Sequence, residues 1–335
     1  MAGYMGRTTM VPLRRLLSGI LVLLWAVSGL PAQEVRCSTR TVIATVIDRE
    51  GNPIRGLTAA NFRGEFCGHA VQIVSGTFDT HPRRIVILLD ASRSMTEEKQ
   101  KWNAEKVIAQ DLLRAASPGM SVALIVFASN VVNSVDFAQG RFGVAQALSA
   151  LGQGVEVAPK GHRRTALYDA ISAGIDLLHP PHSHDVIYSV TDGGDNVSKV
   201  NFARVKQRLL SAQVHLFAFA VAYPVVGPFG EQPGLADLRE LVNVTGGNMF
   251  TLRPGPLDLP FTETYWRSDE VRNAILTNNR QLCQQMGEYY RLEIRLPLVV
   301  DKPRNWKLEV LDASGKVRRD VEVLYPRRLI PCSGD

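Results

Sequence analysis

Short apolar runs alternate with helical segments through the middle of the chain. The run at 84–89 is apolar at nearly every position, as expected for a strand buried on both faces of a parallel sheet. Similar runs follow at 121–127, 185–191, 214–222 and 248–252, with a short one at 131–137. Predicted helices lie between them, at 97–116, 142–151, 166–178, 202–212, 235–243 and 269–286. Strands that alternate with helices predict a doubly wound, mostly parallel α/β sheet.

Both ends of the chain instead read as β structure. Strands are predicted at 41–47 and 71–78, and again at 289–296, 306–312 and 317–325. Each end has few strands, and the N-terminal end has fewer than the three that a stable sheet normally needs. Domain termini also tend to lie close together. We therefore expect the segments 36–80 and 288–332 to pack into one small β module beside an α/β domain at 82–286.

The first 32 residues have the pattern of an export signal. Arg14 and Arg15 precede an apolar run at 16–30, and small residues with a proline follow it. This order predicts a secretory signal peptide at 1–32, cleaved between Gly29 and Gln33. The protein is then secreted or periplasmic, with no membrane insertion after removal of the signal. The alternative is an uncleaved anchor, although the run is shorter than the roughly 20 residues of a membrane span.

Composition and charge narrow the classes of partner. Of the 335 residues, 45% are apolar and 21% are charged, which is typical of a folded globular protein. The net charge of +6 falls to +3 without the three arginines of residues 1–32. The remaining basic residues are scattered along the chain. This distribution argues against nucleic acid or a membrane surface as the partner.

Four cysteines are widely spaced, at Cys37, Cys67, Cys283 and Cys332. In an oxidising compartment an even number of spaced cysteines indicates disulfides rather than a zinc site, whose ligands usually come in close pairs. One arrangement joins Cys37 to Cys332, across the ends of the β module, and Cys67 to Cys283. The other joins Cys37 to Cys67 and Cys283 to Cys332. Both arrangements remain open at this point.

Hydroxyl and carboxyl side chains gather at three predicted loops. Asp90, Ser92 and Ser94 follow the first parallel strand, Thr165 precedes the helix 166–178, and Asp192 follows the strand 185–191. Open α/β sheets bind ligands outside the carboxyl ends of their strands, where these loops are expected.

Each of these residues also has a purely structural explanation. Ser94 and Glu97 fit a capping box, Thr165 fits a helix N-cap, and Asp192 with the glycine after it fits a turn. The three elements occur together, however, and in a specific order: Asp-x-Ser-x-Ser, then Thr, then Asp-Gly.

This order resembles the metal-ion-dependent adhesion site of von Willebrand factor A (VWA) domains, and the segments LLDASRSM and TALYDAI read like that family. The resemblance covers 82–286. The flanking segments VIDREGNPIRGLTAANF and YYRLEIRLP look like those of VWFA-related domains in secreted bacterial proteins. The resemblance implies a Rossmann-like doubly wound sheet with one antiparallel edge strand, which the segment 131–137 fits.

The resemblance also implies the metal site and its use. Ser92, Ser94 and Thr165 would offer neutral hydroxyl oxygens, while Asp90 and Asp192 would hold waters or orient those hydroxyls. Hard oxygen donors with few carboxylates suit Mg²⁺ or Mn²⁺. An ion held mostly by neutral ligands keeps much of its charge and can bind an acidic residue of a protein partner.

The chain departs from the family pattern just before Thr165. Family members usually have small residues there, often glycine, whereas this chain has Arg163 and Arg164. Two arginines beside the site would repel a metal ion and attract an acidic ligand, or they would point into solvent. The substitution affects the expected metal affinity more than the fold.

The sequence therefore predicts a secreted, non-enzymatic protein-binding or adhesion module. The first alternative is a structural or assembly component of the cell envelope with a weak or empty metal site. The second is an extracellular hydrolase, for which the motif support is poor. Asp90 could suggest an aspartyl phosphatase, but Ser92 stands where a second aspartate is needed, and the chain has no G-x-S-x-G, Walker or H-E-x-x-H motif.

Overall fold

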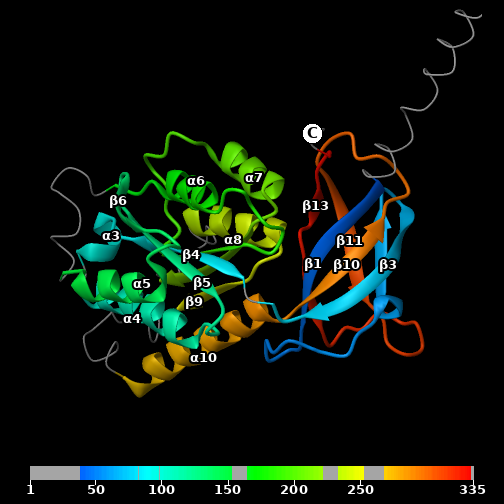
Figure 1. Ribbon diagram of the computed structural model, residues 1–335, viewed down its shortest axis with the longest axis horizontal. Coiled ribbons are helices and arrows are strands. Elements are labelled where there is room, and N and C mark those ends of the chain that lie inside the picture. Colours follow the sequence, from blue (N-terminus) through cyan, green and yellow to red (C-terminus); the bar gives the residue numbers. More distant parts are fainter. Residues whose placement is uncertain are drawn as a thin grey trace, which may run out of the picture.

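The computed structural model of the chain describes residues 38–81, 83–97, 99–152, 164–221, 233–252 and 268–332. An α/β domain and a β module lie side by side (Figure 1). The predicted signal peptide at 1–32, Cys37 and Arg163 lie outside the described residues. None of the helices in the described segments is long and apolar enough to cross a membrane.

The α/β domain is built on a six-stranded sheet with the order β6-β5-β4-β7-β8-β9. Its parallel strands are β4 (Arg84–Asp90), β5 (Ser121–Phe127), β7 (Val186–Thr191), β8 (His215–Val221) and β9 (Met249–Leu252). At one edge, β6 (Val131–Val135) pairs antiparallel with β5. The predicted doubly wound sheet and its antiparallel edge strand are confirmed.

Helices cover both faces of this sheet (Figure 1). One face packs against α4 (Lys99–Ala115), α5 (Gly140–Ala150) and α10 (Asp269–Gly287), and the other against α6 (Leu167–Leu177), α7 (Phe202–Ser211) and α8 (Pro233–Thr245). Alternate residues of β4 therefore enter two separate cores: Ile85 and Ile87 face one, and Val86 and Leu88 face the other. Burial on both faces explains why the strand is apolar throughout.

Both chain ends contribute to one seven-stranded antiparallel sheet, as predicted. The N-terminal segment supplies β1 (Thr39–Ile47), β2 (Phe62–Phe66) and β3 (His69–Asp79), with the 3-10 turn η2 (Ala59–Asn61) between β1 and β2. The C-terminal segment supplies β10 (Tyr289–Arg295), β11 (Arg304–Val310), β12 (Glu322–Leu324) and β13 (Arg328–Leu329). The strand order is β12-β1-β10-β3-β2-β11-β13, so strands from the two ends interleave.

The sheet of the β module curls on itself. β12 and β13 are consecutive in the chain but form opposite edges of the sheet. The Arg40 guanidinium of β1, the strand beside the edge strand β12, donates a hydrogen bond to the carbonyl of Ile330, just beyond the opposite edge strand β13. The strand β2 was not predicted. Its five residues, FRGEF, include a glycine and two charged side chains and have no β-branched residue, so the strand signal is weak.

The β module docks at the amino-terminal ends of the parallel strands. The Thr45 hydroxyl of β1 donates to the Gln285 carbonyl of α10 at 3.1 Å, and the Gln285 amide nitrogen donates to the Gly51 carbonyl at 2.8 Å. Arg83, in the connection from β3 to β4, is 1% exposed, and its guanidinium carbon lies 4.1 Å from the centre of the Tyr289 ring. Gly246, just after α8, lies against the backbone of Tyr325.

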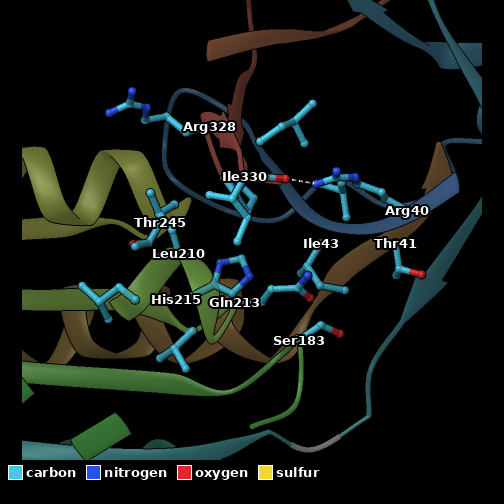
Figure 2. A pocket seen from close by; sticks show the side chains of 15 residues that line it. Arg40, Thr41, Ile43, Ser183, Leu210, Gln213, His215, Thr245, Arg328 and Ile330 are labelled. Carbon is cyan, nitrogen blue, oxygen red and sulfur yellow. Dashed lines mark hydrogen bonds between the residues drawn. The ribbon is translucent and has the colours of Figure 1, made fainter. Parts of the chain in front are cut away.

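A small cavity of about 60 Å³ lies at the same junction (Figure 2). Arg40 and Ile43 of β1 line it from the β module, and His215, at the start of β8, lines it from the α/β domain. Burial lowers the pKa of His215 to about 3, so its ring is neutral at physiological pH. The β module thus covers the amino-terminal end of the parallel sheet and leaves the carboxyl ends of the strands uncovered.

Neither of the two predicted disulfide arrangements is found among the described cysteines. In the part of the chain that the structure describes, no disulfide joins Cys67, Cys283 and Cys332 to one another. Cys283 is buried on α10 within the core of the α/β domain, whereas Cys67 and Cys332 are exposed in the β module. Both arrangements require a bridge to Cys283, which its burial in the other unit prevents. Whether Cys37 pairs with another cysteine stays a prediction.

Gly246→Ala should loosen the docking of the β module. Gly246 has φ +76°, and a Cβ atom there would lie 2.3 Å from the Tyr325 carbonyl carbon. We expect the free energy of unfolding to fall by about 3 kcal/mol or more, because strain and a backbone clash add. The matched control is Gly315→Ala, where φ is +80° and no described atom lies within 4 Å of the added carbon. It should cost only about 1 kcal/mol. Equal losses in urea unfolding would contradict this account.

Cys283 should resist alkylation in the folded protein. Burial raises the pKa of its thiol to about 12, so almost no thiolate forms at pH 8. Iodoacetamide should therefore modify the exposed Cys67 in the native protein and modify Cys283 only in denaturant. Peptide mass mapping of both states measures this. Equal modification of Cys67 and Cys283 in the native state would show that the core around α10 is not closed.

Candidate metal centre at the carboxyl ends of the strands

The side chain of Asp90 is fixed between two neighbouring strands at the end of β4. The residue is fully buried. Its Oδ1 accepts a hydrogen bond from the Ser92 amide at 2.9 Å, and its Oδ2 accepts one from the Thr191 hydroxyl at 2.6 Å. The amide of Asp90 donates to Oε1 of Glu105 at 2.6 Å. The first site residue predicted from sequence is thus held by β4, β7 and α4 together.

Ser92 and Ser94 lie side by side, with their Oγ atoms 3.2 Å apart. A short helix, α3 (Arg93–Thr96), begins here, whereas the sequence predicted one helix from residue 97. Ser94 lies inside α3, and Glu97 pairs with Arg93, so the capping box of Ser94 and Glu97 does not form. Ser92 occupies the N-cap position without a side-chain capping bond. Both hydroxyls are therefore available for another role.

Thr165 is not the N-cap of α6, because that helix begins at Leu167 with Ala166 as its cap residue. Its backbone is instead clamped to the loop after β7. The Thr165 amide donates to Oδ1 of Asn196 at 3.0 Å, and its carbonyl accepts from the Asn196 amide at 2.9 Å. The purely structural interpretation of Thr165 as a cap is wrong. The clamp brings the loops that carry Thr165 and Asp192 together.

Asp192 occupies a turn, as its sequence context suggested. Gly193 has φ +86°, and the Gly194 amide donates to Oδ1 of Asp192 at 3.3 Å. The second oxygen, Oδ2, accepts a hydrogen bond from the Lys101 ammonium at 3.3 Å. The turn therefore leaves the carboxylate directed toward the side chains of α4.

Backbone hydrogen bonds through the end of β5 join two of the three loops. The Ala91 amide donates to the Phe127 carbonyl at 2.6 Å, and the Ala166 amide donates to the Ala128 carbonyl at 2.8 Å. These bonds hold the residues next to Asp90 and Thr165 close to each other at the carboxyl ends of the strands. Together with the Asn196 clamp, they make the three loops one connected structure at the carboxyl ends of β4, β5 and β7.

Carboxyl groups outnumber cations in this region. Burial, with Asp192 nearby, raises the pKa of Asp90 to about 7. Burial and the neighbouring Asp90 raise the pKa of Glu105 well above its usual range. Lys101 is the cation that contacts Asp192. A divalent cation beside Asp90 and Glu105 would favour their ionised forms and would therefore bind in competition with protons.

Sequence reasoning missed Lys101 and Glu105, although the pattern carried a signal. Both are buried on α4, where Lys101, Glu105, Ile108 and Leu112 share one helix face at spacings of four, three and four residues. Two charged residues on the apolar face of a helix must find buried partners. Their partners are Asp192 and the Asp90 amide, which the sequence could not place.

Arg164 lies at the rim of the candidate site. It is exposed, and its Nη2 donates to the Asn196 carbonyl at 2.6 Å. Its side chain is thus tied to the loop that clamps Thr165. This arrangement holds a positive charge near Thr165. Arg163 lies outside the described residues, so its orientation stays a prediction.

The residues present fit a small hard cation. The five predicted positions offer only oxygen donors, from two carboxylates and three hydroxyls, which is the donor chemistry of Mg²⁺ and Mn²⁺. In addition, Oε2 of Glu105 is buried without a hydrogen-bond partner among the described residues. Within those residues, no group of three or more His, Cys, Asp and Glu side chains forms a metal cluster. The proposed ligands are mainly serine and threonine hydroxyls, which a cluster of His, Cys, Asp and Glu side chains does not include.

The metal-free protein should lose stability as pH rises from about 4 to about 7. Asp90 has a pKa near 7 when folded, against 3.8 for an unperturbed carboxyl, so the folded state binds more protons in this window. The free energy of unfolding should fall by an amount on the order of a few kcal/mol. Asp90→Asn removes this titrating group, so the free energy of unfolding should depend less on pH. Urea unfolding with a chelator present measures both, and identical pH profiles would contradict the assignment.

Comparison with known proteins places these loops in one family. The family model of the von Willebrand factor type A domain matches residues 85–194, which include Asp90, Thr165 and Asp192. No curated protein matches the chain.

Several solved structures resemble it at low identity. A von Willebrand factor type A protein from Catenulispora acidiphila is 14% identical with a TM-score of 0.43, over 86% of this chain and 74% of that one. An aerotolerance-related membrane protein from Bacteroides fragilis, carrying multiple mutations to serine, is 14% identical with a TM-score of 0.42, over 61% of this chain and 98% of that one. The conserved hypothetical protein BatB from Bacteroides thetaiotaomicron is 15% identical with a TM-score of 0.42, over the same shares. On the family match and the observed sheet, the chain contains a von Willebrand factor type A domain.

Proposed function

We propose that this chain is an exported, non-enzymatic protein-binding module. Its candidate metal centre would hold Mg²⁺ or Mn²⁺ through Ser92, Ser94 and Thr165, with Asp90 and Asp192 orienting hydroxyls and waters. The ion would then bind a carboxylate of a protein partner. VWA domains generally act as protein-interaction modules, which supports the coarser part of this proposal.

One observation carries the proposal: hydroxyl oxygens that make no structural cap lie beside a buried, fixed carboxylate. Ser92 and Ser94 are 3.2 Å apart, and the Ser92 amide is bound to Asp90. Helix capping does not account for these hydroxyls, and Thr165 is excluded as a cap in the same way. A cation that binds the hydroxyls of Ser92, Ser94 and Thr165 would explain why all three lie at the carboxyl ends of the strands.

The exposure of the site suits a ligand that arrives from outside. Ser92 is buried and Ser94 is exposed, so the oxygens extend from the interior to the surface. A cation held mainly by neutral hydroxyls keeps much of its charge and attracts a carboxylate. Arg164 at the rim would strengthen that attraction. The β module lies at the opposite end of the strands and does not cover this face.

A structural or assembly role with a weak metal site is the second candidate. The observation that favours it is the Lys101 ammonium, which already neutralises Asp192 without a metal. In that case the β module, rather than the metal centre, would supply the main contacts to other envelope components.

Thr165→Ala and Asp90→Ala should each abolish divalent-ion binding while leaving the fold intact. Thr165 would lose a direct ligand oxygen, and Asp90 would no longer fix the groups around the ion. Calorimetric titration with Mg²⁺ and Mn²⁺ measures the affinity. Circular dichroism checks the fold. The control is Ser149→Ala, which removes a hydroxyl bonded only within α5 and should bind metal as the wild type does.

Partner capture supplies the second half of the test. Pull-downs from the native extracytoplasmic fraction should yield a partner with the wild type in Mg²⁺, and none after chelation or with either site variant. Capture that persists under chelation would favour the structural role. If the wild type takes up neither ion at millimolar concentration, the metal-dependent function is rejected. Turnover of an ester or phosphate substrate would reject the non-enzymatic assignment.

A further inference from the structure

We propose that Lys101 is a built-in competitor for the metal centre, whose ammonium must leave before a divalent ion binds tightly. The inference rests on the proposed function, because it concerns the same site and sets how strongly that site holds its ion. It makes metal affinity depend on a residue of α4 that supplies no ligand oxygen.

The position of the ammonium supports this role. Nζ of Lys101 donates to the Ser94 carbonyl at 3.0 Å and to Oδ2 of Asp192 at 3.3 Å. It therefore joins the segment after β4, which carries Ser92 and Ser94, to the loop after β7, which carries Asp192. A cation that bridges these loops stands beside the oxygens that a metal ion would use.

The surroundings of Lys101 make the competition strong. Its side chain is only 4% exposed, so bulk water cannot screen its charge effectively. An ion bound next to Asp192 would lie close to the ammonium, and two cations would share one carboxylate. Because Lys101 is tethered, its local concentration is fixed by the chain and does not fall with dilution.

Release of the ammonium would be a side-chain motion. Lys101 lies in the first turn of α4, and its charge sits on a flexible four-carbon stem. Rotation of that stem would move the ammonium away from Asp192 while the backbone of the helix keeps its place. Glu105, one turn further along the same face, keeps its hydrogen bond with the Asp90 amide during such a rotation. The hydrogen bond that holds Asp90 would therefore remain when a metal ion replaces the ammonium.

Titration of Lys101→Met with Mg²⁺ and Mn²⁺ tests the inference directly. We expect the Kd for either ion to fall at least tenfold relative to the wild type. Lys101→Gln, which keeps a hydrogen-bond donor but no charge, should show the same direction of change. The matched control is Lys106→Met on the same helix, since the Lys106 ammonium bonds to the Gly152 carbonyl. Its Kd should stay within about twofold of the wild-type value.

Thermal unfolding gives a second readout, independent of calorimetry. In chelator, Lys101→Met should melt at a lower temperature than the wild type, because Asp192 loses its cation. Added Mg²⁺ should then raise its Tm by more than it raises that of the wild type. If Lys101 only stabilised the fold, Lys101→Met would lower Tm by the same amount with and without Mg²⁺.

The outcomes separate this inference from the proposed function. Wild-type binding that equals or exceeds that of both Lys101 variants overturns the inference and leaves the metal-dependent function in place. Binding by the Lys101 variants alone supports the inference and rejects metal-dependent function for the wild type. If neither wild type nor variants bind either ion, both are rejected.

Discussion

The carboxyl group of Asp90 is buried where two parallel strands end, and the geometry of the candidate site depends on it. One oxygen holds the Ser92 amide, and the other holds the Thr191 hydroxyl at the end of β7. A buried carboxyl group is costly unless its oxygens are satisfied. The contacts that satisfy Asp90 also set the direction in which the chain leaves β4, and thereby position Ser92 and Ser94.

The same burial brings carboxyl groups together and disfavours the ionised forms of Asp90 and Glu105. Glu105 lies behind Asp90 and accepts from its amide, and Asp192 lies close enough to raise the pKa of Asp90. The Lys101 ammonium contacts Asp192. In our proposal this tethered ammonium and a divalent ion are alternative cations beside the same carboxyl groups.

The amino-terminal and carboxyl ends of the parallel strands have different surroundings. At the amino-terminal ends, α10 continues directly into β10, so the last helix of the α/β domain is covalently joined to a central strand of the β module. Hydrogen bonds from Thr45 and Gln285 fix this junction. Among the described residues, the β module makes no contact at the carboxyl ends of the strands. A partner bound at the metal centre would therefore contact the VWA domain without displacing the β module.

The sequence by itself determined the parallel sheet, its antiparallel edge and the joining of both chain ends. Apolar runs such as 84–89 have few alternatives to a strand buried on both faces, and isolated pairs of strands cannot stand alone. It also identified the loops with Asp90, Thr165 and Asp192, because strand ends follow from strand positions. Only the tertiary structure decided that Thr165 is clamped by Asn196 and that Lys101 meets Asp192 across 91 positions of the chain. It also decided that Cys283 is buried away from Cys67. Such contacts depend on how distant segments pack, which local residue patterns do not specify.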